Sequence, residues 1–214
     1  MHPCVTAMQG CSVALMFALT VDQVESQEQG DLVDGVLDEL ASVPTALPFT
    51  RTVGDEFQGL LDDPVSVVDA ILILMRTEHW HIGLGIGPVE RPLPTDSRRA
   101  RGAAFVCART AVNSAKSEPS HLCVVAARED DHEAYDVEAV LRLTAAVRRR
   151  RSEPGWAAID LMRAGRTQSE VAERLGISRQ AVGQRLQVAD WSVEEAVRPT
   201  LARLLTRADG AASA

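Results

Sequence analysis

The sequence predicts an α+β protein in which a sheet-containing unit is followed by a smaller all-α unit. Strand-length apolar segments alternate with helical segments as far as residue 127, whereas the residues beyond Asp136 have helical patterning alone. Charge divides the chain near the same place. Residues 1–146 hold 10 Lys and Arg against 22 Asp and Glu, a net charge of −12, and residues 147–214 hold 12 Arg against 8 acidic residues, a net charge of +4. Such a change of sign indicates two units with different partners, the basic one being the candidate for binding nucleic acid.

The first four elements follow from apolar patterning and turn chemistry. Val13–Leu19 is a continuous apolar run of strand length, as expected for a strand that is buried on both faces. Gly30–Val43 carries apolar residues at helical spacing, which predicts an amphipathic helix. Phe49–Val53 and Glu56–Leu61 then form two strands, because Gly54-Asp55 between them suits a tight hairpin turn.

The next four elements complete the sheet-containing unit. Pro64 stands near the first turn of a helix whose apolar body reaches Met75. Trp80–Val89 is a strand in which glycine alternates with Leu and Ile. Its glycine face lets either a helix or a ligand approach closely, and a packed helix is the commoner of the two. A helix over Gly102–Lys116 and a strand over Leu122–Ala127 follow. The first six elements give the order βαββαβ, which is ferredoxin-like and palm-like.

The most specific functional pattern is a helix-turn-helix over Arg166–Leu186. Thr167 and Glu170 predict a capping box at the start of one helix. Gly176 suits the left-handed conformation that ends that helix, and Ser178 suits the cap of the next one. Small and apolar residues between these signals are spaced to form a compact core, and this geometry presents a helix to DNA.

Neighbouring segments are expected to support this pattern. The helices Trp156–Arg163 and Ser192–Leu205 complete the small core, with Trp156 and Trp191 inside it. A helix over Asp136–Arg151 links the two units and ends in the run Arg148–Arg151. That run is either solvated charge or a contact to DNA phosphates.

The second helix of the pattern leaves a polar face free for DNA. Gln can pair with adenine edges and Arg with guanine edges, and polar side chains at a helix N-terminus suit backbone phosphates. The expected DNA-binding residues are Gln168, Ser169, Ser178, Arg179, Gln180, Gln184 and Arg185. The pattern resembles the helix-turn-helix of many bacterial regulators, which implies double-stranded DNA as a partner and a homodimer that reaches successive major grooves. A helical hairpin with a solvated polar face is the alternative.

Acidic residues at strand ends form a second candidate site. Asp22 follows the first strand, and Asp55 and Glu56 lie at the hairpin of the next two strands. These strands are neighbours in a ferredoxin-like sheet, so the carboxylates can meet in space. Palm-type domains hold Mg²⁺ with paired carboxylates of this kind; in the enzyme alternative Asp22 and Asp55 would be its ligands and Glu56 would assist. Turn chemistry at the hairpin and capping by Asp22 are the simpler alternatives.

Two resemblances concern the same residues. Val53-Gly54-Asp55-Glu56-Phe57 resembles the GGDEF signature of diguanylate cyclases, with Val53 in place of the first glycine. The span Val13–Ala127 more closely resembles the SatD family of small bacterial proteins. The matching positions are Asp22 and Ser26, Gly54 to Gly59, Gly83 to Gly87, Gly102 to Phe105, and Ala108-Arg109. The resemblance implies a palm-like fold, and we expect any ligand of this unit to be a nucleotide placed over Asp22, Asp55 and the glycine-rich strand.

These observations predict the organisation and function of the chain. A leader over residues 1–12 precedes a SatD-type unit over 13–130, a linker helix over 131–152, a helix-turn-helix domain over 153–208 and a tail over 209–214. The predicted function is a sequence-specific DNA-binding transcriptional regulator whose sheet-containing unit dimerises, senses a ligand, or both. One alternative is a Mg²⁺-dependent nucleotide cyclase or nucleotidyltransferase-like enzyme with a DNA-targeting tail. Val53, which stands in place of the first glycine of the GGDEF signature, argues against this alternative. A protein-interaction scaffold is another.

Cysteine and histidine spacing disfavours zinc. Cys4, Cys11, Cys107 and Cys123 form no Cys-x-x-Cys pair, and His79 and His81 share a strand face without a third ligand in sight. The apolar run over residues 13–21 is too short to cross a bilayer, and no Lys or Arg precedes it. We therefore expect a cytoplasmic protein that does not enter a membrane.

Overall fold

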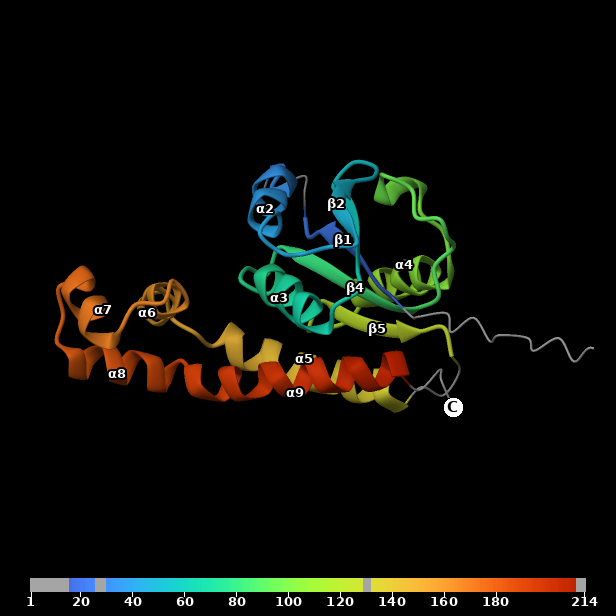
Figure 1. Ribbon diagram of the computed structural model, residues 1–214. Helices are drawn as coiled ribbons and strands as arrows, with labels where there is room; N and C mark the ends of the chain where they lie inside the picture. Colours follow the sequence, from blue (N-terminus) through green and yellow to red (C-terminus); the bar gives the residue numbers. More distant parts are fainter. Residues whose placement is uncertain (1–15, 26–29, 129–131, 211–214) are drawn as a thin grey trace, which may run out of the picture.

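The computed structural model describes residues 16–25, 30–128 and 132–210. They form an α+β structure in which three helices project from one side of a sheet-containing body (Figure 1). The strands are β1 (Met16–Gln23), β2 (Leu47–Arg51), β3 (Glu56–Leu61), β4 (Trp80–Gly87) and β5 (Leu122–Ala126). The helices of the body are α2 (Val33–Leu40), α3 (Pro64–Leu74), the 3₁₀ helix η1 (Ser97–Arg99), α4 (Ala103–Ala115) and α5 (His132–Arg149). They are followed by α6 (Glu153–Arg163), α7 (Gln168–Leu175), α8 (Arg179–Val188) and α9 (Trp191–Gly210). The expected leader over residues 1–12 and the residues 211–214 of the expected tail lie outside the described residues.

The five strands form one mixed sheet in the order β2-β3-β1-β4-β5. The central strand β1 is antiparallel to both β3 and β4, whereas β4 and β5 are parallel and are joined through α4. The expected order of strands and helices is therefore the observed one. The first strand, expected over Val13–Leu19, is described from Met16 and continues to Gln23, so Asp22 lies inside the strand and not beyond its end; residues 13–15 of the expected strand lie outside the described residues. In this register Asp22 is opposite Glu56 on one side and His81 on the other.

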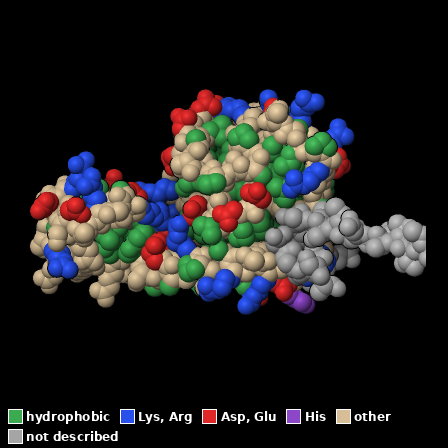
Figure 2. All heavy atoms as spheres, in the orientation of Figure 1, with side chains coloured by type: hydrophobic (Ala, Val, Ile, Leu, Met, Phe, Trp, Pro, Cys, Tyr) green, Lys and Arg blue, Asp and Glu red, His purple; other side chains and the backbone are tan. Residues whose placement is uncertain are grey.

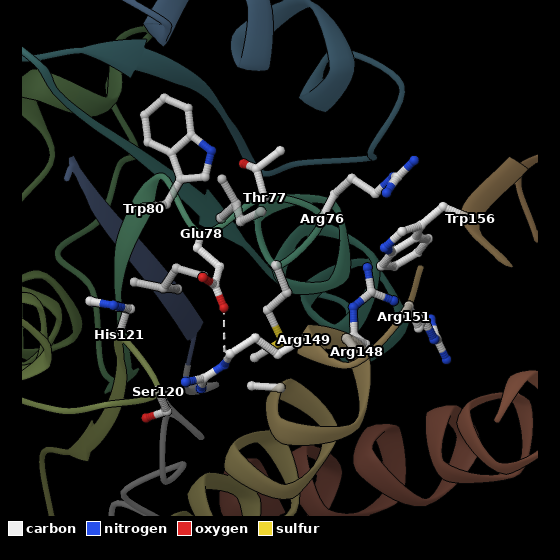
Figure 3. A pocket seen from close by; sticks show the side chains of 14 residues that line it. Arg76, Thr77, Glu78, Trp80, Ser120, His121, Arg148, Arg149, Arg151 and Trp156 are labelled. Carbon is white, nitrogen blue, oxygen red and sulfur yellow. Dashed lines mark ion pairs between the residues drawn. The ribbon is translucent and has the colours of Figure 1, made fainter. Parts of the chain in front are cut away.

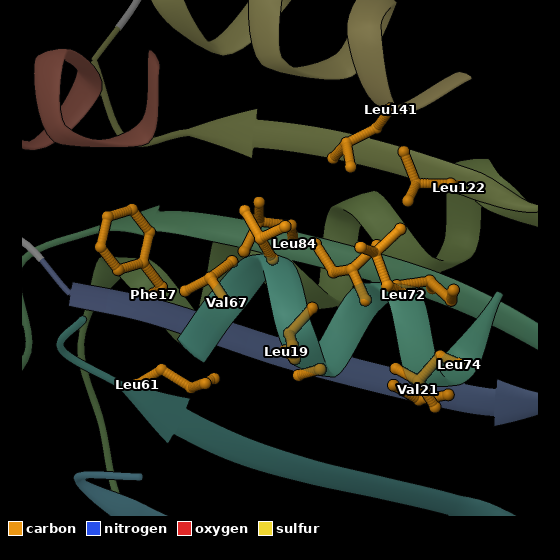
Figure 4. Close-up of a cluster of buried hydrophobic side chains, with 14 of the residues drawn as sticks. Phe17, Leu19, Val21, Leu61, Val67, Leu72, Leu74, Leu84, Leu122 and Leu141 are labelled. Carbon is orange, nitrogen blue, oxygen red and sulfur yellow. The ribbon is translucent and has the colours of Figure 1, made fainter. Parts of the chain in front are cut away.

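The main hydrophobic core lies between the sheet and the helices α2, α3, α5 and α9 (Figures 1 and 4). Alternate residues of the strands point into it because successive side chains of a strand face opposite sides. Its fully buried members include Phe17, Leu19, Phe57, Leu61, Ile71, Leu84 and Leu122. Burial of each such side chain contributes about 1.5–3 kcal/mol, so this face of the sheet is the main source of stability.

Helix α4 covers the opposite face of the sheet at the glycines of β4. A Cβ atom at Gly83 would overlap the α4 backbone at Ala108 and Val112, and one at Gly85 would overlap it at Ala104 and Ala108. The alternation of glycine in this strand therefore allows close helix packing, the commoner of the two expected uses.

The C-terminal helix α9 returns to the sheet-containing body. It runs beside α5, and its residues Leu201, Leu205 and Ala208 are buried in the main core. The expectation that Ser192–Leu205 completes the small helical core is therefore wrong for most of this helix. Only its beginning, at Trp191, packs against that core. The sequence predicts a helix in this segment, but not the surface against which that helix packs.

Candidate nucleic-acid interface and carboxylate cluster

Helices α7 and α8 are joined by a three-residue turn whose ends are capped as expected. The Thr167 backbone N–H donates to Glu170 Oε2 over 2.7 Å, and the Glu170 N–H donates back to Thr167 Oγ1 over 3.4 Å, which completes the capping box. Gly176 ends α7 with φ of 65°, in the left-handed region that suits glycine. Ser178 Oγ accepts a hydrogen bond of 3.1 Å from the Ala181 N–H and so starts α8.

A small core fixes the angle between these helices. Trp156 and Ile159 of α6 pack with Val171 of α7 and with Val182 and Leu186 of α8. All five side chains are buried. Because neighbouring side chains of α8 are held in this core, the helix presents its remaining face to solvent in a fixed orientation.

The polar face of α8 is available for a partner. Arg179, Gln180 and Gln184 are exposed, and their side chains make no hydrogen bond or ion pair with the described part of the chain. Helix α8 carries two arginines, the exposed Arg179 and the half-buried Arg185, and it carries no acidic residue. Side chains of this kind can donate to phosphates and pair with base edges in a major groove.

The beginning of α7 adjoins this face. A Cβ atom at Gly183 of α8 would lie 3.9 Å from Gln168 Oε1, so Gln168 lies directly against the second helix. Ser169 is exposed beside it, and Ser178, although it caps α8, is exposed as well. Gln168 at the start of α7 therefore adjoins α8, whose exposed residues include Arg179, Gln180 and Gln184.

Two arginines of the run Arg148–Arg151 have neither of the roles expected for this run, which were solvated charge and contact with DNA phosphates. The side chains of Arg148 and Arg151 are each 1% exposed, so they are neither solvated nor accessible to a DNA backbone. Both surround the carboxylate of Glu194 on α9, which is 2% exposed, and Arg163 of α6 also donates to it. One acidic group therefore holds α5, α6 and α9 together.

This buried cluster shifts the protonation equilibria of its members. Burial lowers the pKa of Arg148 to about 10, against the opposing effect of Glu194. Burial alone would raise the pKa of Glu194, but the charge of Arg148 and its hydrogen bond bring it below the usual value. Helical spacing could have identified Arg148, because it continues the buried positions Val137, Leu141 and Ala145 of α5. Its acidic partner, 46 residues further on, has no such signal.

The carboxylates of the sheet lie close together but are already paired with basic residues. Glu56 accepts two hydrogen bonds from Arg109 of α4 and one of 2.6 Å from Thr52 Oγ1. Asp22, its neighbour across the strands, forms an ion pair of 2.8 Å with Lys116 at the end of α4. Asp55 occupies the hairpin turn. The expected proximity of Asp22 and Glu56 is confirmed, whereas their cationic partners on α4 were not anticipated from the sequence.

Histidine and cysteine add no metal site to the described residues. The Nδ1 atoms of His81 and His121 are 3.2 Å apart, and burial, followed by the charge of His121, lowers the pKa of His81. Cys107 and Cys123 are buried free thiols whose pKa values burial raises. Within residues 16–25, 30–128 and 132–210, no three His, Cys, Asp or Glu side chains gather as a metal site.

Comparisons with known proteins do not assign the chain. No protein-family model matches it, and a search of curated proteins also finds no match. None of the helices in the described part of the chain combines the length and apolar character that a membrane span needs.

Proposed function

We propose that this protein is a sequence-specific DNA-binding transcriptional regulator, in which α7 and α8 form a helix-turn-helix. The observation that carries the proposal is the face of α8. Arg179, Gln180 and Gln184 are exposed there without intramolecular partners among the described residues. The helix that carries them is held in place by its capping residues and by the small core. In this reading α8 is the recognition helix, which enters the major groove, and Gln168 and Ser169 contact the backbone beside it.

We assign the sheet-containing unit a sensing or dimerising role. Its strand order β2-β3-β1-β4 and its βαββαβ connectivity support a ferredoxin-like, palm-like fold, to which β5 adds a parallel edge. A homodimer is the usual way for helix-turn-helix proteins to reach two half-sites, and a bound nucleotide is the ligand class that we infer for this unit.

The geometry supports the enzyme alternative less well. Asp22, Asp55 and Glu56 supply the carboxylate oxygens that Mg²⁺ prefers, and bound Mg²⁺ would there polarise a nucleotide phosphate. However, Asp22 is paired with Lys116, and Glu56 is paired with Arg109. A metal would have to displace both cations from the two carboxylates, so this set of donors fits it poorly.

DNA binding by α8 can be tested with the variant Arg179→Ala/Gln180→Ala. Fluorescence anisotropy with fragments of the gene's own upstream region, against shuffled fragments of equal length, measures affinity and sequence preference. Each base contact contributes about 1–3 kcal/mol, so we expect the double variant to bind at least about tenfold more weakly and to lose its preference. Arg203→Ala, at an exposed position on α9, is the control and should bind as the wild type does. Unchanged affinity and preference in the double variant would show that α8 is not the recognition helix.

A further inference from the structure

Helix α5 has an exposed face on the side opposite to the main core. Its buried residues, which include Val137, Leu141 and Ala145, face the sheet. On the other side, Tyr135 is 65% exposed and Leu143 is 66% exposed. Helices α5 and α9 form the lower edge of the molecule (Figures 1 and 2), where Figure 2 shows hydrophobic and charged side chains next to one another. Two large apolar side chains on one solvent-facing side of a helix indicate an interaction surface.

The exposed residues of this face follow a regular spacing. They are separated alternately by four and by three positions and form a stripe of His132, Asp136, Ala139, Leu143, Ala146 and Arg150, all of them exposed. This is the spacing of the seam in a two-helix coiled coil, where each side chain of one helix packs between side chains of the other. The alanines allow a second helix to approach closely, and Leu143 fills the space between the helices. The stripe therefore has the form of a helix-pairing surface.

The two ends of the stripe carry opposite charges. Asp136 lies near the start of α5, Arg150 directly follows its end, and neither side chain makes a hydrogen bond or ion pair with the described part of the chain. The neighbouring Arg149 differs, because Figure 3 shows its side chain directed towards Glu78, and its Nε lies 3.1 Å from a carboxylate oxygen of that residue. Asp136 and Arg150 are 14 positions apart, about 21 Å along a helix, so they cannot pair within one chain.

We propose that this stripe, flanked by Tyr135, binds the same stripe of a second copy of the chain in an antiparallel arrangement. A two-fold axis near position 141 brings Ala139 level with Leu143 of the partner subunit, so that a small side chain meets a large one. Asp136 then lies about one helical turn, 5.4 Å along the axis, from the level of Arg150 of the partner subunit, which the long arginine side chain spans.

The charges select this orientation over a parallel one. In a parallel pair each Asp136 would lie beside its own equivalent, and so would each Arg150, and like charges across an interface are unfavourable. In the antiparallel pair the acidic end of one stripe lies beside the basic end of the other, twice over by symmetry. The partner that fits this surface is therefore a second copy of the same chain.

This interface gives a location to the dimerising role proposed for the sheet-containing unit. It rests on that part of the proposed function and does not depend on DNA binding. The two-fold axis also relates the two copies of α8, so they are presented in inverted orientation. If α8 binds DNA as proposed, the operator is an inverted repeat, and this consequence alone rests on DNA binding.

Sedimentation velocity on the full chain, without DNA and over a range of protein concentrations, tests the interface. We expect a monomer–dimer equilibrium for the wild type. Its dissociation constant should rise at least about tenfold in Leu143→Glu, because dimerisation would bury a carboxylate without a counter-charge. Val106→Glu on α4 is the matched control, since Val106 is 67% exposed but lies outside the stripe, and this variant should dimerise as the wild type does. Far-ultraviolet circular dichroism checks that both variants keep the wild-type fold.

Exchange of charges tests the antiparallel orientation. Asp136→Arg and Arg150→Asp each place like charges beside one another across the interface, so we expect each to weaken dimerisation. The double variant Asp136→Arg/Arg150→Asp restores opposite charges and should return the dissociation constant towards that of the wild type. Because the two positions are too far apart to interact within one chain, such a rescue can arise only from contact between two copies.

The possible failures can be told apart. A wild-type chain that remains monomeric at about 200 µM overturns the interface and the dimerising role together. A dimer with wild-type affinity in Leu143→Glu forms through another surface and overturns the α5 interface alone. Weakened single charge variants without rescue in the double variant overturn the antiparallel pairing. DNA affinity is measured separately, so a chain that dimerises as expected but binds no DNA leaves this inference intact.

Discussion

Glu194 is the residue on which the junction between the two parts of the molecule depends. It lies on α9 and binds arginines from α5 and α6, so three helices separated in the sequence meet at one carboxylate. Buried charges of this kind do not by themselves add much stability, because desolvation offsets their attraction. Removal of one partner is different, because it leaves the others buried without compensation.

We therefore expect Glu194→Gln to be strongly destabilising. The variant leaves Arg148 and Arg151 buried beside a neutral group, and the loss of one partner from a buried ion pair costs about 3–5 kcal/mol. Glu195→Gln, one residue further on, removes an exposed carboxylate that lies 3.9 Å from Arg198. The free energy of unfolding in urea should fall by less than about 1 kcal/mol in this control. Equal stability of the two variants would mean that Glu194 does not hold the cluster together.

At the scale of elements, glycine has opposite roles in β4 and in α2. Gly85 of β4 is in contact with the α4 backbone, so the sheet and the helix approach more closely than side chains would permit. Gly35 of α2 has open space around the position of a Cβ and an ordinary helical backbone. The same substitution therefore has different consequences at the two positions.

Gly85→Ala and Gly35→Ala test this difference directly. The added methyl group at Gly85 forces α4 away from the sheet, which we expect to reduce the free energy of unfolding by about 1–3 kcal/mol. At Gly35 the methyl group meets nothing and raises helix propensity, so we expect a gain of about 0.5–1 kcal/mol. Urea denaturation monitored by circular dichroism measures both values. A neutral Gly85→Ala would contradict the close packing of α4.

Local signals explain which elements and residues the sequence predicts well. The Thr167–Glu170 capping box, Gly176 and the alternation in β4 each depend on residues near one another in the chain, and each was anticipated. The pairing of Asp22 with Lys116 and of Arg148 with Glu194 depends on how distant elements pack. Patterning shows which face of α5 or α9 is buried, but the identity of the surface it meets is set only by the assembled fold.

At the scale of the whole molecule, the two parts share their last helix. The start of α9 packs against the small helical core, and its second half is buried in the core of the sheet-containing body. The body therefore lacks part of its core until the end of the chain is in place. This arrangement differs from a helical domain that is simply appended to a complete sheet domain.

A chain that ends at Asp190 should accordingly lose stability in its sheet-containing part. The truncation exposes the partners of Leu201 and Leu205, each 0% exposed, at a cost of about 1.5–3 kcal/mol per side chain. Thermal unfolding followed by circular dichroism should show a lower midpoint, and limited proteolysis should cut within α5. Removal of residues 211–214 alone leaves every described contact in place and should change neither result. A truncated chain as stable as the full one would show that the body folds without α9.

The length of α9 also gives the molecule a mechanical property. A helix of 20 residues, such as this one, is about 30 Å long, so a tilt of about 5° at its buried end moves the other end by about 2–3 Å. Only Ala189 and Asp190 separate that end from α8. The helix therefore couples the main core directly to α8, and a tilt of this size displaces α8 by slightly less than the spacing between neighbouring base pairs, about 3.4 Å.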